Sequence, residues 1–322
     1  ISMAMGTSVG TVTVLVPIAA AISQTAGINI ALCVGTVVGG AMFGDNLSFV
    51  SDTTIAATKT QGVEMKDKFR VNFKVALPAA FITLIILIII SMESGAAEFA
   101  IQEFNIIQTV PYFIVLFISL MGINVFVALC TGVLLFILTG IITKSLTIAS
   151  AFSAMGGGTS DMFETIVVAI LVAAIGALIK ENGGFSAILK FIKSTFKGKK
   201  GGMFGIGLLV ALMDIATANN TVAIVLAGPI AKDISSEYDI DPRYSASILD
   251  TFSCIAQGII PYGAQLLIAV SLANSVIKDA NITSLDIMPY LFYQFALMII
   301  VSLSIVFYKD NKDIKTINKE SF

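Results

Sequence analysis

The chain contains no histidine and no tryptophan among its 322 residues, and only 12% of the residues are charged. Without histidine, no imidazole is available to carry a proton near neutral pH or to bind a metal ion. The three cysteines lie far apart within apolar segments, which fits neither a disulfide framework nor a zinc site. Because the formal net charge is −2, we expect no nucleic acid as a partner.

Hydrophobic residues make up 57% of the chain, and the mean hydropathy is +0.94. A soluble domain has about 25% charged residues, roughly twice the fraction found here. Several apolar runs reach the roughly 20 residues that a helix needs to cross a bilayer. The sequence therefore predicts an all-α, polytopic integral membrane protein whose first partner is the lipid bilayer.

The basic residues gather in short stretches between the apolar runs. Residues 59–74, 190–200 and 309–322 hold most of them, so we predict that these stretches are cytoplasmic. Residues 93–109 hold acidic residues and no lysine or arginine, and we place this loop outside. This pattern predicts a multi-pass protein of a bacterial inner (plasma) membrane with a cytoplasmic C-terminus. Lysines such as Lys68 are interpreted as topological.

A polar stretch interrupts the apolar sequence at residues 44–54, which read GDNLSFVSDTT. An aspartate at the middle of a bilayer costs roughly 2.5–3.5 kcal/mol on insertion scales, so intramembrane carboxylates usually face a partner, a cavity or an ion path. A helix that breaks here leaves backbone carbonyls and amides unpaired at the break. The predicted ion- and proton-binding residues are Asp45, Asn46, Ser48, Ser51, Asp52 and Thr53, with Thr7 and Ser8 from the apolar run before them.

Carboxylate, hydroxyl and carbonyl oxygens suit a hard cation such as Na⁺. Asp45 and Asp52 would supply the negative charge, and a proton would compete with Na⁺ for one carboxylate. The alternative for Asp52 is structural, because Ser-Asp-Thr before an apolar run is also a helix-capping pattern.

Two further segments are apolar at both ends and polar in the middle. Residues 201–231 have arms of about 13 residues, too short to span at 1.5 Å per residue, so we predict a re-entrant hairpin with its tip at TANN. Residues 246–273 predict another broken helix. The residues assigned to a substrate or second ion site are Asp214, Asn219, Asn220, Thr221, Gln257 and Gln265. Turn formation and polar contacts between helices are the alternative roles.

Residues 7–19 and 219–231 resemble each other, with Pro17 matching Pro229. The same offset places the two broken segments over each other, in an order that is typical of inverted repeats in secondary transporters. We expect residues 1–92 to be the C-terminal part of a first repeat whose N-terminal part is missing. Residues 93–109 would then be the external loop, 110–308 the second repeat and 309–322 the cytoplasmic tail. A chance match of apolar segments is the alternative.

The stretch GDNLSFVSDTT, with GTSVGT and PIA before it, resembles the NhaC family of Na⁺/H⁺ antiporters. The resemblance extends over the hydropathy of the whole chain, and TANNT looks like the tip of the family's second hairpin. Phe49 departs from the family pattern, which has proline there. The resemblance implies a secondary transporter with re-entrant hairpins and broken helices, and its relatives include carriers of amino acids and carboxylates.

These observations predict a Na⁺/H⁺ antiporter, with Na⁺ and H⁺ as partners. The second hypothesis is a Na⁺- or H⁺-coupled carrier of an amino acid or small carboxylate. We expect no enzymatic activity and no cofactor beyond Na⁺ as the transported or coupling ion. A small organic solute and a second copy of the chain, in a homodimer, are the remaining partners considered.

Overall fold

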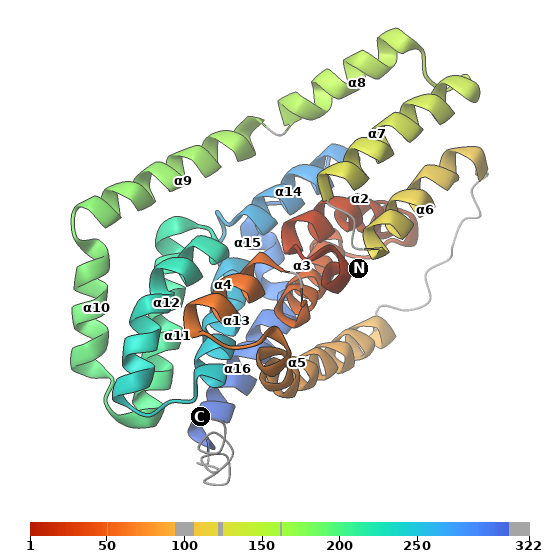
Figure 1. Cartoon of the computed structure of the whole chain (residues 1–322). Coiled ribbons are helices and arrows are strands. Elements are labelled where there is room, and N and C mark those ends of the chain that lie inside the picture. The colour runs from red at the N-terminus through yellow and green to blue at the C-terminus, as the bar shows by residue number, and fades with distance from the viewer. Residues whose placement is uncertain (50, 94–105, 122–124, 162, 309–322) are drawn as a thin grey trace.

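The computed structural model describes residues 1–49, 51–93, 106–121, 125–161 and 163–308, and every regular element in these ranges is a helix (Figure 1). Among the described residues, five helices are long and apolar enough to cross a membrane. A sixth span is obtained if Ser284–Tyr290 and Phe292–Val306, which meet at a bend of 53°, are taken together. The prediction of a polytopic all-α membrane protein is confirmed.

The N-terminal part of the chain forms five helices whose ends follow ordinary capping rules. Thr7 and Asn29 cap two of them, each accepting a hydrogen bond from a backbone amide three residues on. Gly27 ends the helix between them with a φ of 65°, a conformation that costs glycine little. The helices are α1 (Ser2–Met5), α2 (Ser8–Ala26), α3 (Ile30–Leu47), α4 (Asp52–Gln61) and α5 (Met65–Glu93).

The C-terminal part repeats this order of a helical hairpin followed by a broken helix. Asn219 caps the second arm of the hairpin, and Asp241 caps the first half of the broken helix, which begins with Pro242. The elements are α11 (Gly198–Thr217), α12 (Asn220–Glu237), α13 (Pro242–Ile259), α14 (Ala264–Val276), α15 (Ser284–Ile287), η1 (Met288–Tyr290) and α16 (Phe292–Val306).

The two parts share their helix boundaries at one spacing. The first residues of α3 and α13, their last residues, and the first residues of α4 and α14 are all 212 positions apart. Thr7 and Asn219, the caps of α2 and α12, have the same separation. Across the two parts, α2 packs on α14 and α12 packs on α4. The match seen in the sequence therefore extends to the positions where the helices begin and end.

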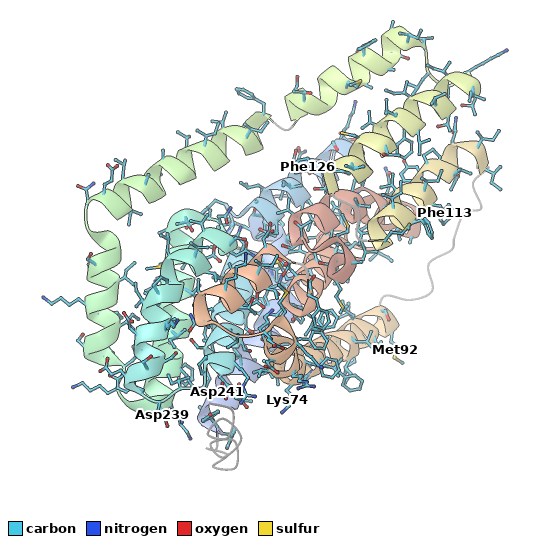
Figure 2. The ribbon with its side chains drawn as sticks, in the orientation of Figure 1. Lys74, Met92, Phe113, Phe126, Asp239 and Asp241 are labelled. Carbon is cyan, nitrogen blue, oxygen red and sulfur yellow. The ribbon has the colours of Figure 1, made fainter. Side chains whose placement is uncertain are left out.

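Five helices between these parts run along the outside of the bundle in Figure 1, where α8 and α9 extend along one side. Apolar side chains such as Phe113 and Phe126 point outward, as does Met92 of α5 (Figure 2). Exposed apolar surface of this kind is what a lipid-facing helix presents. The helices are α6 (Ile106–Leu120), α7 (Val125–Ile142), α8 (Ile148–Asp161), α9 (Phe163–Glu181) and α10 (Gly184–Thr195).

The hairpin expected at residues 201–231 differs from the prediction in its arms. Its turn lies at Ala218, within the predicted TANN tip, but α11 and α12 have 20 and 18 residues instead of about 13. The arms are longer because α11 begins at Gly198, inside the basic stretch 190–200 that we predict to be cytoplasmic, and α12 continues to Glu237. The bounds placed at 93–109 and 309–322 fall largely or wholly outside the described residues.

A close helix contact gives a test of this packing. A Cβ atom added to Gly35 of α3 would lie 2.9 Å from Cβ and 3.0 Å from the carbonyl oxygen of Tyr290, so Gly35→Ala should lower the free energy of unfolding by about 1–3 kcal/mol. Gly40→Ala, in the same helix with no atom within 4 Å, should be neutral or stabilising by up to about 1 kcal/mol. Thermal unfolding in detergent measures both, and equal effects would contradict the contact.

Candidate ion-binding site

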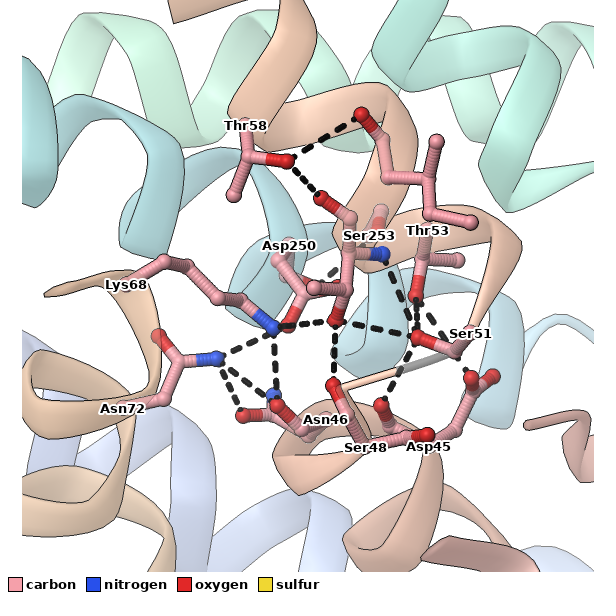
Figure 3. A network of polar contacts seen from close by, with 12 residues as sticks. Asp45, Asn46, Ser48, Ser51, Thr53, Thr58, Lys68, Asn72, Asp250 and Ser253 are labelled. Atoms are coloured by element: carbon pink, nitrogen blue, oxygen red, sulfur yellow. Dashed lines mark hydrogen bonds and ion pairs between the residues drawn. The ribbon is translucent and has the colours of Figure 1, made fainter. Parts of the chain in front are cut away.

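The break between α3 and α4 is buried inside the helix bundle. Ser48 and Ser51 have extended backbones at its two ends, and Ser51 Oγ accepts a hydrogen bond of 3.2 Å from the amide of Thr54. Asp45 and Asn46 lie in the last turn of α3, directly before the break. Figure 3 shows how these side chains gather around the interruption. The break therefore places carboxylate, hydroxyl and carbonyl oxygens together in the interior.

Asp45 has an exposed fraction of only 3%. Ser8 Oγ of α2 donates a hydrogen bond of 2.8 Å to Asp45 Oδ2, and Thr53 Oγ1 of α4 lies 3.5 Å from Oδ1. Among the ion pairs of the described residues, none includes Asp45. A buried carboxylate held only by hydroxyl groups carries charge that its protein neighbours do not balance.

A chain of hydrogen bonds joins Asp45 to the second broken helix. Gln265 Nε2 of α14 donates to Ser8 Oγ at 3.0 Å, and Gln257 Nε2 of α13 donates to Gln265 Oε1 at 2.8 Å. Gln257 Nε2 also lies 3.2 Å from the carbonyl oxygen of Ala218, at the turn between α11 and α12. Gln257 and Gln265, which we had assigned to a separate site, thus contact the same network as Asp45.

Asp214 lies in the last turn of α11 and is completely buried. Within the described residues, neither of its carboxylate oxygens has a hydrogen-bond partner. Its backbone carbonyl accepts the amide of Ala218 at 2.7 Å, so the carboxylate lies one turn from the residue that Gln257 contacts. Asn220 has a buried side-chain nitrogen that is likewise unpaired in this part of the chain.

Besides Asp214 and Asn220, four of the predicted site residues do not join this network through side-chain contacts. Asp52 is exposed and is the first residue of α4, because Ser51 occupies the capping position. Asn219 and Thr7 act as helix caps, and Thr221 donates its amide to the side chain of Asn220. The structure therefore brings Asp45 together with Ser8, Ser51 and Thr53, but it separates Asp52 from Asp45.

A buried ion pair that we do not predict from the sequence lies beside the break. Lys68 Nζ lies 2.6 Å from Asp250 Oδ2, and both side chains are almost fully buried. The interpretation of Lys68 as a topological loop residue is wrong, because α5 begins at Met65 and the helix face with Lys68 and Asn72 is buried inside the bundle. One signal was available, since Lys68 and Asn72 are four residues apart and so share a helix face. The position of a charged residue, Asp250, within an apolar run was a second signal.

Asn72 ties this ion pair to the break. Its Nδ2 atom lies 2.7 Å from Asn46 Oδ1, 2.9 Å from the Asn46 carbonyl and 2.8 Å from Asp250 Oδ2. Lys68 Nζ donates to the same carbonyl at 2.9 Å. Side chains of α5 therefore donate hydrogen bonds to the Asn46 carbonyl, which the helix break leaves unpaired at the C-terminal end of α3.

A family model described as the Na⁺/H⁺ antiporter family matches residues 1–92 and 93–309. The chain belongs to this family. The resemblance seen in the motif around Asp45 is thereby confirmed, as is the prediction of a protein of membrane transport.

Several curated relatives support this membership at low identity. The chain is 23% identical to the malate-2H⁺/Na⁺-lactate antiporter of Bacillus subtilis over 95% of its own length and 70% of the relative's. It is 22% identical to the Na⁺/H⁺ antiporter NhaC of the same organism, over 91% and 70%. It is also 22% identical to the arginine/ornithine antiporter ArcD of Halobacterium salinarum, over 83% and 60%. The chain thus spans 60–70% of the length of these relatives.

The link through Ser8 can be tested by stability. Ser8→Ala removes the donor to Asp45 and the acceptor of Gln265, so it should lower the free energy of unfolding by about 1–3 kcal/mol. The double variant Ser8→Ala/Gln265→Leu should cost less than the sum of the two single variants, because the two residues share one contact. Ser275→Ala, at an exposed hydroxyl, is the matched control. Additive effects in thermal unfolding would contradict a direct link.

Proposed function

We propose that this antiporter exchanges Na⁺ for H⁺ and that Asp45 carries both ions in turn. The observation that supports the proposal is a buried carboxylate, without a protein cation in contact, at a helix break lined by oxygen atoms. Intramembrane carboxylates in such positions usually serve an ion path. Na⁺ or a proton supplies the positive charge that the neighbours of Asp45 do not.

The chemistry needs only competition for one site. Na⁺ would bind the Asp45 carboxylate together with the hydroxyl oxygens of Ser8 and Thr53, while protonation of the carboxylate removes the charge that holds Na⁺. A site that is open to one side at a time then releases one ion as the other arrives. No enzymatic step and no cofactor other than Na⁺ enter this scheme.

Alternating access would come from movement of one inverted repeat against the other. The shared helix boundaries and the packing of α2 on α14 and of α12 on α4 support the assignment of 1–92 and 110–308 to two repeats. Asp45, Ser8 and Gln265 lie where elements of the two repeats meet, so relative movement would change access to this site. The distribution of the basic residues supports a cytoplasmic C-terminus and a location in a bacterial plasma membrane.

A carrier of an amino acid or small carboxylate is the second candidate function. The unpaired carboxylate of Asp214 and the unpaired amide of Asn220 mark further buried polar groups that such a solute could engage. Gly263 is the N-cap residue of α14 and has no side chain that could cap the helix. The backbone amides at this helix N-terminus are therefore suited to binding a carboxylate. Two of the relatives above are named for carboxylate and amino-acid exchange.

Substitution of Asp45 tests the ion exchange directly. Everted vesicles with a preformed proton gradient report antiport as dequenching of a pH-sensitive dye on addition of Na⁺, Li⁺ or K⁺. Asp45→Asn should reduce the response to Na⁺ at least about tenfold, because a neutral amide loses the charge-assisted contact. Asp279→Asn, at an exposed aspartate, is the matched control. Wild-type activity in Asp45→Asn would remove this carboxylate from the mechanism.

The same assay separates the two candidate functions. Under Na⁺/H⁺ exchange, Na⁺ alone should dequench the dye, and lactate, malate or arginine should leave the response within about twofold of that value. A response that requires one of these solutes, and that is lost in Asp214→Asn, would instead establish the solute carrier.

A further inference from the structure

The Lys68 ammonium group is enclosed by three oxygen atoms of different kinds. Its Nζ atom lies 2.6 Å from the carboxylate of Asp250, 2.7 Å from the hydroxyl of Thr54 and 2.9 Å from the carbonyl of Asn46. The side chain of Lys68 is 1% exposed and that of Asp250 is 0% exposed. The charged end therefore lies inside the bundle next to the broken helix (Figure 3).

This set of ligands is the kind that binds a small hard cation. A carboxylate, a hydroxyl and a backbone carbonyl at the C-terminal end of a half-helix are oxygen donors of the type that coordinates Na⁺ in broken-helix transporters. We propose that Lys68 is a tethered cation that fills a second cation site, formed by Asp250, Thr54 and the carbonyl of Asn46. A free monovalent cation would take the place of its ammonium group if the side chain were removed.

The fold does not require a charged group at this position. At the spacing of 212 residues, Asn46 corresponds to Gly258, Thr54 to Leu266 and Asp250 to Val38. Leu266 and Val38 are both fully buried apolar residues. The other half of the chain thus forms the same kind of break with these two apolar residues and the neutral side chain of Gln294, which lies against Gly258. Buried ion pairs are commonly replaceable by apolar residues without loss of stability.

The Lys68 site adjoins Asp45 without sharing its carboxylate. Ser51 Oγ lies 3.2 Å from the carbonyl of Asp45 and 3.0 Å from Thr54 Oγ1, the atom that Lys68 contacts. With Lys68 in place, one of two neighbouring cation sites is permanently occupied, and Asp45 remains for the exchangeable ion. The assignment of Lys68 does not depend on which ion is transported, because it concerns binding alone.

Removal of the lysine in an Asp45→Asn background tests the proposal without interference from the first site. Purified full-chain Lys68→Ala/Asp45→Asn should unfold at a lower temperature than Asp45→Asn in choline chloride, a cation too large for the site. NaCl or methylammonium chloride at equal ionic strength should raise its Tm by at least about 5 °C at roughly 100 times the dissociation constant. Asp45→Asn alone, with Lys68 present, gives the baseline shift, because a cation that reaches Asp214 stabilises both variants equally. The shift in the variant without Lys68 should exceed this baseline.

The matched control removes the carboxylate as well. Lys68→Ala/Asp250→Asn/Asp45→Asn should return to the baseline shift in Tm of Asp45→Asn, because the site vacated by Lys68 then carries no charge. The proposal is overturned if the variant with Asp250 intact gains no more than this baseline from Na⁺ or methylammonium, or if the triple variant gains as much. If Lys68→Ala is recovered only as aggregate in choline, the monodisperse fraction obtained in each salt replaces Tm as the readout, with the same two outcomes.

Discussion

The interruption between α3 and α4 is the constraint on which the other features of the site depend. In a bilayer, backbone groups freed by a helix break must find partners within the protein. Here the carbonyls of Asp45, Asn46 and Ser48 accept hydrogen bonds from the side chains of Ser51, Lys68 and Thr54. One donor thus comes from α5, which itself packs against α13 and α16. The break can persist only while these elements stay in contact.

The buried charges around the break do not balance. Among the described residues, the fully or almost fully buried acids are Asp45, Asp214 and Asp250, whereas the one comparable base is Lys68. Lys68 neutralises Asp250 and leaves two carboxylates without a protein cation. Since uncompensated charge in a membrane interior is costly, the folded protein gains stability from any cation or proton that reaches these two groups. The burial of these two carboxylates therefore favours the binding of a cation or a proton.

The broken helices, the hairpin turn and the place of Asp45 at a helix break could be predicted from the sequence, because polar interruptions of apolar runs are local signals. The difference between Asp45 and Asp52 could not, because the residue at which α4 begins decides which face of α4 Asp52 occupies. Ser51 takes the cap, and Asp52 therefore turns outward. The pairing of Lys68 with Asp250 joins residues that are distant along the chain. Only the packing of α5 against α13 brings them together.

The two halves use equivalent positions in different ways. Asp45 and Thr53 contact each other in the first half, and Gln257 and Gln265, each 212 residues later, do so in the second. Gln257 and Gln265 keep a hydrogen bond between these two equivalent positions, but neither side chain carries a charge. Conversely, Asp214 lies 212 residues after Ser2, a neutral residue that bonds the carbonyl of Ala41. Each half therefore contributes one buried carboxylate without a cation in contact, Asp45 in the first and Asp214 in the second. These two carboxylates do not occupy equivalent positions, so the charge is distributed asymmetrically over a symmetric repeat.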